Sequence, residues 1–442
     1  MLLNYLLFLS SAQASQVIWD GHYRTRAQLF NSLSLSDTNS LAEGLSTEDT
    51  HRFRLQPTWA IDHQTKITTQ IDILPFTNWG MDSVHYATPS LSEDLFTDSA
   101  LRHQTLQSNN PLLVQRLWAE HQLEHLWISF GRMPHHWGSG MIFHSGNDPL
   151  SEFGNSVDRF AISTTVEDVY IQASADRYEK ILMNDSDGAF GGSLMFLYQN
   201  ESAQGGLYTL LQKEKADEAT FSLFTIDLQG STQTGPLNAE IEVAYQFGKG
   251  DLSGGVDDVR VSSVGAYFNL DYQIDRYKIG LGGALAQGDK ERNDTKYTRF
   301  TFNQDLNVGM LLFEEPLPTL QAISPSAQNE GRDYSAVRTG YSVSNALLIK
   351  PTFTATLVDD LDGSLSVLAA RAFNLPEDEG SNRNYGVEID ASLKWIPTPH
   401  FNLSGTVAYL LPGTYYKNSN SALDGTFNKN VLGMQLLGVA SF

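Results

Sequence analysis

The sequence of 442 residues contains no cysteine, and beyond its N-terminus no apolar run approaches the ~18 residues that a membrane helix requires. Without cysteine the chain forms no disulfide, which fits an exported protein that needs none. Without a long apolar run, an exported chain can cross the inner membrane without stopping there. Basic residues are also few, since 29 Lys and Arg stand against 51 Asp and Glu, a formal charge of −22. This balance argues against nucleic acid or anionic lipid as a partner, because both are negatively charged and bind surfaces rich in Lys and Arg.

Alternating apolar and polar residues run through much of the chain, as expected of β-strands, whose side chains point to opposite faces in turn. Glycine (35), tyrosine (18) and phenylalanine (23) are frequent, which fits many short strands joined by tight turns. In residues 237–247 the apolar side chains share one face, whereas Glu240 and Glu242 lie on the other. A carboxylate that faces a dry core is costly unless it is paired. The repeated carboxylates therefore indicate water on that face.

The final residues, Asn430 to Phe442, have the pattern of a strand with an uncharged apolar face that ends on an aromatic residue. A strand at the end of a chain has an unpaired edge, which a closed barrel removes by pairing it with the first strand. The segment resembles the C-terminal signal of bacterial outer-membrane barrels. This resemblance implies that the barrel-assembly machinery recognises Phe442. One strand alone leaves an ordinary soluble β-sandwich as the alternative.

Connection lengths separate these alternatives, because a membrane barrel has short turns at its periplasmic end and long loops outside. The long connections include 36–50, 75–111, 132–156, 248–257 and 287–344, and the short ones include 62–65, 124–126 and 167–168. Segment 213–218 interrupts the rhythm. The sequence therefore predicts an all-β protein, a closed antiparallel transmembrane β-barrel of about 18 strands, with 16 as the alternative.

The N-terminal residues 1–14 are apolar and then small, and they end in Ala12-Gln13-Ala14, the small-x-small pattern of a signal-peptidase site. We expect a signal peptide that is cleaved before Ser15, followed by one barrel domain over residues 15–442. The segment lacks the Lys or Arg that normally precedes the apolar core. A start site further upstream, an atypical signal and a buried N-terminal helix are the alternatives.

Basic residues concentrate on the expected water-facing side of the first strands, in an otherwise acidic chain. They are Arg24, Arg26, Arg52, Arg54, Lys66 and Arg116, and Asp72 and Glu120 lie on the same wall. Arginines across a water-filled pore from carboxylates would create a transverse field that orders dipolar solutes and favours anions. The alternative is that each Arg pairs with a neighbouring carboxylate and holds the wall rigid.

The connection 132–156 combines several glycines and two prolines with few charges, which indicates a shaped loop. Arg132, His135 and His136, near its start, are predicted to line a constriction. The adjacent histidines could be half of a metal site, but adjacent side chains usually point apart and no second pair has ligand spacing. We therefore expect no metal and no other cofactor.

Several short segments along the chain form a recognisable set. They are Phe30-Asn31, Arg54-Leu-Gln-Pro57, Thr69-Gln-Ile-Asp72, Gly131-Arg-Met-Pro134, Trp137-Gly138, Val157-Asp-Arg159, Phe302-Asn303, Asn307-Val-Gly309 and Leu312-Phe-Glu314. With these segments the chain resembles a functionally uncharacterised family of large proteobacterial outer-membrane β-barrel proteins. More loosely, the architecture is similar to alginate-export barrels and general porins. General porins fold their third loop into the pore, so the resemblance implies that 132–156 does the same here. It implies nothing about the substrate.

The connection 287–344 is the longest and contains the apolar run 308–313. An exposed apolar run of this length is a liability. We expect it to pack either into the lumen, as a plug, or onto a neighbouring subunit.

The function that these features favour is that of an outer-membrane porin, through which small hydrophilic solutes diffuse without any catalysed reaction. The alternative is a non-conducting structural barrel that assembles with copies of itself. A surface hydrolase is a third possibility, although the sequence has no Gly-x-Ser-x-Gly motif and no phosphate-binding loop. We expect export through the periplasm to the outer membrane, contact with outer-membrane lipid and lipopolysaccharide, a homo-oligomer, and no nucleic-acid partner.

Overall fold

The computed structural model describes residues 15–33, 35, 45–78, 112–151, 154–179, 188–216, 219–252, 256–290, 295–315, 317, 342–375, 382–417 and 428–442. The expected signal segment, residues 1–14, lies outside the described residues. Within them the chain is almost entirely β-structure, with one short helix, α3 (Thr414–Lys417). None of the helical structure in this part of the chain is long and apolar enough to cross a membrane.

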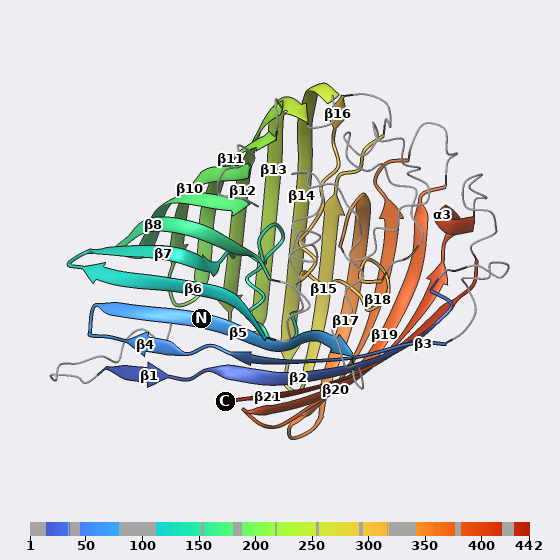
Figure 1. Cartoon of the computed structure of the whole chain (residues 1–442). Coiled ribbons are helices and arrows are strands. Elements are labelled where there is room, and N and C mark those ends of the chain that lie inside the picture. The colour runs from blue at the N-terminus through green and yellow to red at the C-terminus, as the bar shows by residue number, and fades with distance from the viewer. Residues whose placement is uncertain are drawn as a thin grey trace.

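Eighteen strands of the described chain form a closed antiparallel β-barrel (Figure 1). In ring order they are β2 (Gly21–Asn31), β3 (Leu45–Leu55), β5 (Thr65–Asn78), β6 (Leu112–Leu123), β7 (Leu126–Pro134), β8 (Ser156–Val166), β9 (Val169–Glu179), β10 (Gly188–Gln199), β11 (Ala203–Ala216), β12 (Ala219–Thr234), β13 (Leu237–Leu252), β14 (Val256–Ile274), β15 (Tyr277–Ala286), β17 (Ala346–Val358), β18 (Leu361–Ala372), β19 (Asn384–Thr398), β20 (Phe401–Pro412) and β21 (Val431–Ser441). The short strands β1 (Gln16–Ile18) and β4 (Thr58–Ala60) pair with each other and extend β2 and β3, and β16 (Lys296–Tyr297) pairs with β14.

The ring closes where the last strand pairs with the first. Strand β21 lies antiparallel to β2 over the register from His22↔Ser441 to Phe30↔Gly433. Two further backbone hydrogen bonds join Gly21 and Phe442, with N···O distances of 3.3 and 3.1 Å. Closure leaves no free edge and confirms the predicted barrel, and it excludes the two packed sheets of a sandwich.

Short turns and both ends of the described chain lie at one end of the barrel. These turns are residues 61–64, 124–125, 167–168, 200–202, 235–236, 275–276, 359–360 and 399–400. The other end carries the connections 32–44, 79–111, 135–155, 287–345 and 413–430 among others. Apart from the two short connections within β11 to β14, short and long connections therefore alternate as in a membrane barrel.

Strands β11 to β14 are longer than the sequence suggested. Only residues 217–218 join β11 to β12, and only 253–255 join β13 to β14, so the loop expected over 248–257 is largely strand. The same holds for the start of segment 213–218, where Lys213 and Lys215 continue the β-pairing, opposite Ser222 and Thr220. Their polarity indicated a loop, whereas the ladder simply continues. In Figure 1, β13 and β14 rise above the other walls.

The two faces of the wall differ in chemistry as the alternation predicts. On β13, Ile241, Val243 and Tyr245 are exposed on the outside, while Glu242 and Ala244 are buried on the inside. The same pattern recurs around the ring, where large apolar side chains are exposed outward on almost every strand. A polar inner face and an apolar outer face are what a barrel needs if lipid surrounds it and water enters it.

Candidate functional site

The inner wall formed by β2, β3, β5 and β6 carries the predicted basic residues. Arg24, Arg52, Arg54 and Arg116 are each 1–4% exposed, so their guanidinium groups are enclosed by protein. Alternation along each strand places all four on the inner face, and Arg24 lies directly opposite Arg52 in the ladder. Four enclosed guanidinium groups require hydrogen-bond acceptors nearby, because a buried charge without partners is costly.

The acceptors come from the β7–β8 loop (residues 135–155), which is folded into the barrel. Arg24 Nη1 donates to the carbonyl oxygen of Ser151 at 3.2 Å, and Arg54 Nη1 donates to that of Gly146 at 2.5 Å. Arg52 Nη2 donates to the carbonyl oxygen of Pro149 at 3.4 Å. The loop predicted over 132–156 therefore lies inside the lumen. There the arginines hold it by its backbone.

Arg116 makes the densest set of these contacts. Its Nη2 donates to the carbonyl oxygens of Ser145 and Asn155, the latter at 3.1 Å, and its Nη1 donates to Asn147 Oδ1 at 2.8 Å. Its Nη1 also donates to Gln70 Oε1 at 2.9 Å on the neighbouring strand. The Arg116 side chain thus joins the wall to three separate points of the β7–β8 loop.

The carboxylates predicted on this wall form ion pairs with two of its basic residues. Asp72 accepts two hydrogen bonds from Arg54, at 2.7 and 2.8 Å, and both side chains are almost fully buried. Glu120 lies 3.0 Å from Lys66 Nζ, and both side chains are about one-fifth exposed. Arg26 is half-buried on the same face. Neighbour pairing, one of the two suggested roles, therefore occurs at Arg54, whose Nη1 also binds the β7–β8 loop.

The far side of the β7–β8 loop reaches the opposite wall, formed by β11 to β13. The ring of Trp137 stacks on Tyr208 with centroids 5.5 Å apart. The Ser139 backbone N–H donates to Glu242 Oε2 at 2.6 Å, and the Ser139 hydroxyl donates to the same oxygen. The loop is therefore bound at both walls and crosses the lumen between them. Figure 1 shows its coil inside the outline of the barrel.

Gly138 gives the first test of this placement. Its φ is +55°, and a Cβ there would collide with the Glu242 carboxylate and crowd Gln229. We expect Gly138→Ala to displace Ser139 from Glu242 and to lower the heat-unfolding midpoint of the folded barrel. Gly235→Ala is the matched control, because its φ is +56° and nothing lies within 4 Å of the added carbon. The control should lose only the roughly 1–2 kcal/mol of left-handed strain. Equal losses in the two variants would contradict the proposed contact.

The β15–β17 loop (residues 287–345) also enters the lumen and touches the β7–β8 loop. Asn303 N–H donates to the carbonyl oxygen of Met141 at 2.7 Å. In the other direction, Gly154 N–H donates to Asp305 Oδ2 at 2.6 Å. The two loops therefore form one packed layer across the barrel.

Glu388, on the inner face of β19, binds the tip of the β15–β17 loop. Its carboxylate accepts backbone N–H groups from Met310 at 2.6 Å, Leu311 at 2.9 Å and Leu312 at 2.6 Å. A Cβ at Gly309 would lie only 2.9–3.0 Å from the two carboxylate oxygens, so a residue without a side chain allows this approach. Three consecutive N–H groups around one carboxylate form a charge-assisted anchor.

The apolar run 308–313 is buried in the lumen. Leu311 and Leu312 are fully buried and belong to a cluster that includes Phe30 of β2 and Leu368 of β18. Phe313 packs edge-on against Tyr385 with centroids 5.5 Å apart. Of the two placements that the sequence left open, the structure shows packing within the chain's own lumen.

The predicted residues at the start of the β7–β8 loop have different placements. Arg132 belongs to β7 and faces outward, where it pairs with Asp158 at 2.7 Å, so it does not line the lumen as the sequence suggested. His135 is buried, with its ring stacked on Phe143 and its Nε2 2.9 Å from the Tyr208 hydroxyl. His136 Nδ1 accepts the Ser145 N–H at 3.2 Å.

Neither histidine adds positive charge to the lumen near neutral pH. Burial lowers the pKa of His135 well below its ordinary value, and burial together with nearby His144 lowers the pKa of His136 to about 4. Among the described residues, no group of three or more His, Cys, Asp or Glu side chains is arranged to hold a metal ion. The positive charge of this region therefore rests on the arginines and Lys66.

Comparison with known proteins gives matches in structure alone. No family model matches the chain, and no curated protein matches it significantly in sequence. The BenF-like porin from Pseudomonas fluorescens Pf-5 is 10% identical with a TM-score of 0.55, and Pseudomonas aeruginosa OccK9 (OpdG) is 9% identical with a TM-score of 0.53. OpdK of Pseudomonas aeruginosa, solved with vanillate, is 12% identical with a TM-score of 0.52. Each match covers 96% of this chain and 98% of the other.

The chain has the porin fold. At 9–12% identity the similarity shows the fold alone, namely the closed barrel of these outer-membrane proteins. Within that fold, sequence reasoning missed Glu388 and the loop-binding role of Glu242. The sequence offered one signal for them, since alternation places both acids on the inner face of a strand. A buried acid there needs hydrogen-bond donors, and the long loops can supply them.

Proposed function

We propose that the protein is an outer-membrane channel through which small hydrophilic solutes diffuse passively. The observation that carries this proposal is the β7–β8 loop, which crosses the lumen and is bound to both walls by backbone contacts. A barrel of 16–18 strands is wide enough for an aqueous channel unless loops fill it. In this proposal, the loop fixed across the barrel narrows the passage and sets the size of the solutes that pass.

The charges of the two walls suggest which solutes pass best. Hydrogen bonds to carbonyl oxygens leave the charge of Arg24, Arg52 and Arg116 intact, so the β2–β6 wall stays positive. The opposite wall carries Asp227 and Glu242. The positive β2–β6 wall favours anions on its own side of the lumen. One structural neighbour, OpdK, was solved with vanillate, an aromatic carboxylate, which is consistent with a small organic anion.

Single-channel recording on the purified, folded protein in a planar bilayer tests the proposal. We expect discrete conductance steps and a current whose reversal potential in a salt gradient indicates anion preference. Liposome swelling with neutral sugars of increasing size would then give the cut-off set by the loop layer. An electrically silent barrel that is folded and inserted would overturn the proposal.

Ion selectivity provides a sharper prediction. Replacing Arg24, Arg52 and Arg116 by Ala removes three positive charges from the inner wall, so the ratio of anion to cation permeability should fall. Arg132→Ala is the matched control, because this arginine faces outward and pairs with Asp158. Reversal potentials measured across a salt gradient report the ratio directly. If the triple variant conducts with unchanged selectivity, the wall charge does not control which ions pass.

A non-conducting structural barrel is the second candidate, and one observation favours it. The apolar cluster around Leu311 and Leu312 fills the part of the lumen beside β17 to β21 and β2 with side chains. If this cluster and the β7–β8 loop together leave no continuous water path, the protein would serve as a scaffold in the membrane. Silence in bilayers, combined with stable assemblies of several copies in mild detergent, would support this role. In either case we propose that the protein catalyses no reaction.

A further inference from the structure

A groove of about 700 Å³ lies on the outer face of the barrel at the long-loop end of β17, β18 and β19. Long loops face the outside in this class of barrel, so the groove lies at the level of the outer leaflet. Its lining residues are Leu347, Leu348, Ile349, Ala369, Ala370, Arg371, Arg383, Asn384, Gly386 and Val387. The lining is therefore apolar apart from its upper rim.

The strand register explains this shape. Arg371 sits between Leu347 of β17 and Asn384 of β19 in the uppermost row, and one step below, Ala369 sits between Ile349 and Val387. The small side chain of Ala369 makes the groove deep, because the side chains beside it on β17 and β19, Ile349 and Val387, are larger. Polar groups occupy one end and apolar groups the other, as an amphiphilic ligand requires.

The upper rim is basic and contains no acid among its lining residues. Arg371 is exposed, and in the described part of the chain it takes part in no ion pair. Arg383, two residues past the undescribed segment 376–381, donates one hydrogen bond to the carbonyl oxygen of Phe373 at 3.0 Å, which leaves its charge intact. The net charge of the chain disfavours anionic lipid as a general partner. The charge of this one groove has the opposite sign.

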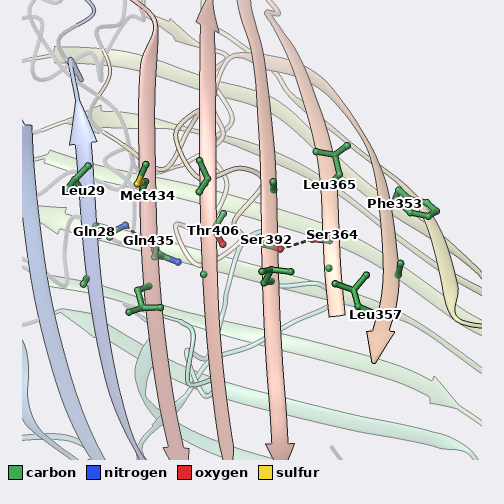
Figure 2. A pocket seen from close by; sticks show the side chains of 18 of the residues that line it. Gln28, Leu29, Phe353, Leu357, Ser364, Leu365, Ser392, Thr406, Met434 and Gln435 are labelled. Carbon is green, nitrogen blue, oxygen red and sulfur yellow. Dashed lines mark hydrogen bonds between the residues drawn. The ribbon is translucent and has the colours of Figure 1, made fainter. Parts of the chain in front are cut away.

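A second groove, of about 920 Å³, lies on the outer wall and is lined by residues of β17 to β21, β2 and β3 (Figure 2). Phe353, Leu357 and Leu365 border it on β17 and β18, as the figure shows. Its lining also includes the small residues Gly363 and Ala355, which lie directly opposite each other in the ladder. Leu365 lies four residues along β18 from Ala369, so the apolar surface runs on from the upper groove.

We propose that this outer wall binds a phosphorylated lipid of the outer leaflet, with Arg371 and Arg383 on its phosphate and its acyl chains along the apolar grooves. Arginine guanidinium groups match phosphate geometry better than any other side chain. Free phosphate would use the rim alone, whereas the apolar grooves below it match hydrocarbon. The inference rests on the proposed outer-membrane location and not on conduction.

The test measures lipid binding by the intact folded barrel in detergent. Purified protein is titrated with bis-phosphorylated lipid A, and native mass spectrometry counts the bound lipids. Each basic residue near a membrane surface contributes about 1 kcal/mol, so the double variant R371Q/R383Q should weaken binding roughly 30-fold. Arg276→Gln is the control, because Arg276 lies in a short turn at the other end of the barrel and contacts Tyr277. It should leave binding unchanged.

Further arms separate the sources of affinity. Lipid A without phosphates should bind like the double variant, and Ala369→Phe, which fills the upper groove, should weaken binding while both arginines remain. Equal binding of the two lipids, or inorganic phosphate that displaces lipid A completely at equal concentration, would overturn the proposal. So would an unaffected R371Q/R383Q variant. Conductance of R371Q/R383Q should equal wild type, so failure here leaves the channel proposal untouched.

Discussion

Deleting Asn307–Glu314 is expected to raise single-channel conductance several-fold. These residues form the tip of the β15–β17 loop, whose Leu311 and Leu312 are fully buried inside the barrel. Their removal would empty the part of the lumen beside Glu388, and the space would fill with water because Glu388 and Asp390 line it. Conductance rises with the cross-section of the water path. Recordings in planar bilayers under identical salt would measure the increase.

A point variant separates the anchor from the bulk of the loop. Glu388→Ala removes the acceptor of three backbone N–H groups, so the loop tip should detach and the current should fluctuate between low and high levels. Asp362→Asn is the control, since Asp362 accepts a hydrogen bond from Thr356 near a short turn, away from both loops. If the deletion leaves conductance unchanged in a folded barrel, the segment does not obstruct the water path.

Asp72→Ala is expected to lower the free energy of unfolding by about 3–5 kcal/mol. The reason is that Arg54 would then remain almost fully buried with its charge uncompensated, bound only to the Gly146 carbonyl oxygen. Equilibrium denaturation in lipid vesicles measures the change. Asp72 and Arg54 also lie under the β7–β8 loop, so the variant should loosen the constriction as well as the wall.

The chain supplies its own control for this prediction. Arg132 and Asp158 form a pair with the same shortest distance, 2.7 Å, and the same two hydrogen bonds, but their side chains are 50% and 46% exposed. That pair lies on the outer face near the long-loop end of β7 and is not enclosed by protein, so Asp158→Ala should cost only about 0.2–1 kcal/mol. The contrast isolates burial as the cause. A loss in Asp158→Ala as large as that in Asp72→Ala would show that burial does not set the difference.

The barrel was predictable because its main determinant is local and periodic. Alternation along β13 and β21 identifies the two faces, and the short connections place the turns, with no knowledge of distant contacts. Predictions failed where the cue for a strand end was ambiguous. Gly131 and Pro134 indicated a loop, yet β7 runs on through both, and Arg132 therefore continues the outward row of Phe130.

The partners inside the lumen could not be predicted in the same way. Arg24 and Ser151 lie 127 residues apart, and Met310 and Glu388 lie 78 residues apart. Periodicity shows that an arginine or a glutamate faces inward, but it carries no information about which loop backbone fills the space there. The sequence could therefore predict that the basic residues face inward. Their binding of the β7–β8 loop could be seen only in the three-dimensional structure.

The hydrogen bonds from the arginines to the β7–β8 loop affect how the loop sequence can evolve. They hold carbonyl oxygens, a group that every amino acid possesses, and so the loop's path does not depend on most of its side chains. Substitutions there can alter what the passage admits while its course stays fixed. To engineer a new selectivity, one would therefore vary the side chains of the β7–β8 loop first and keep the arginines of the wall unchanged.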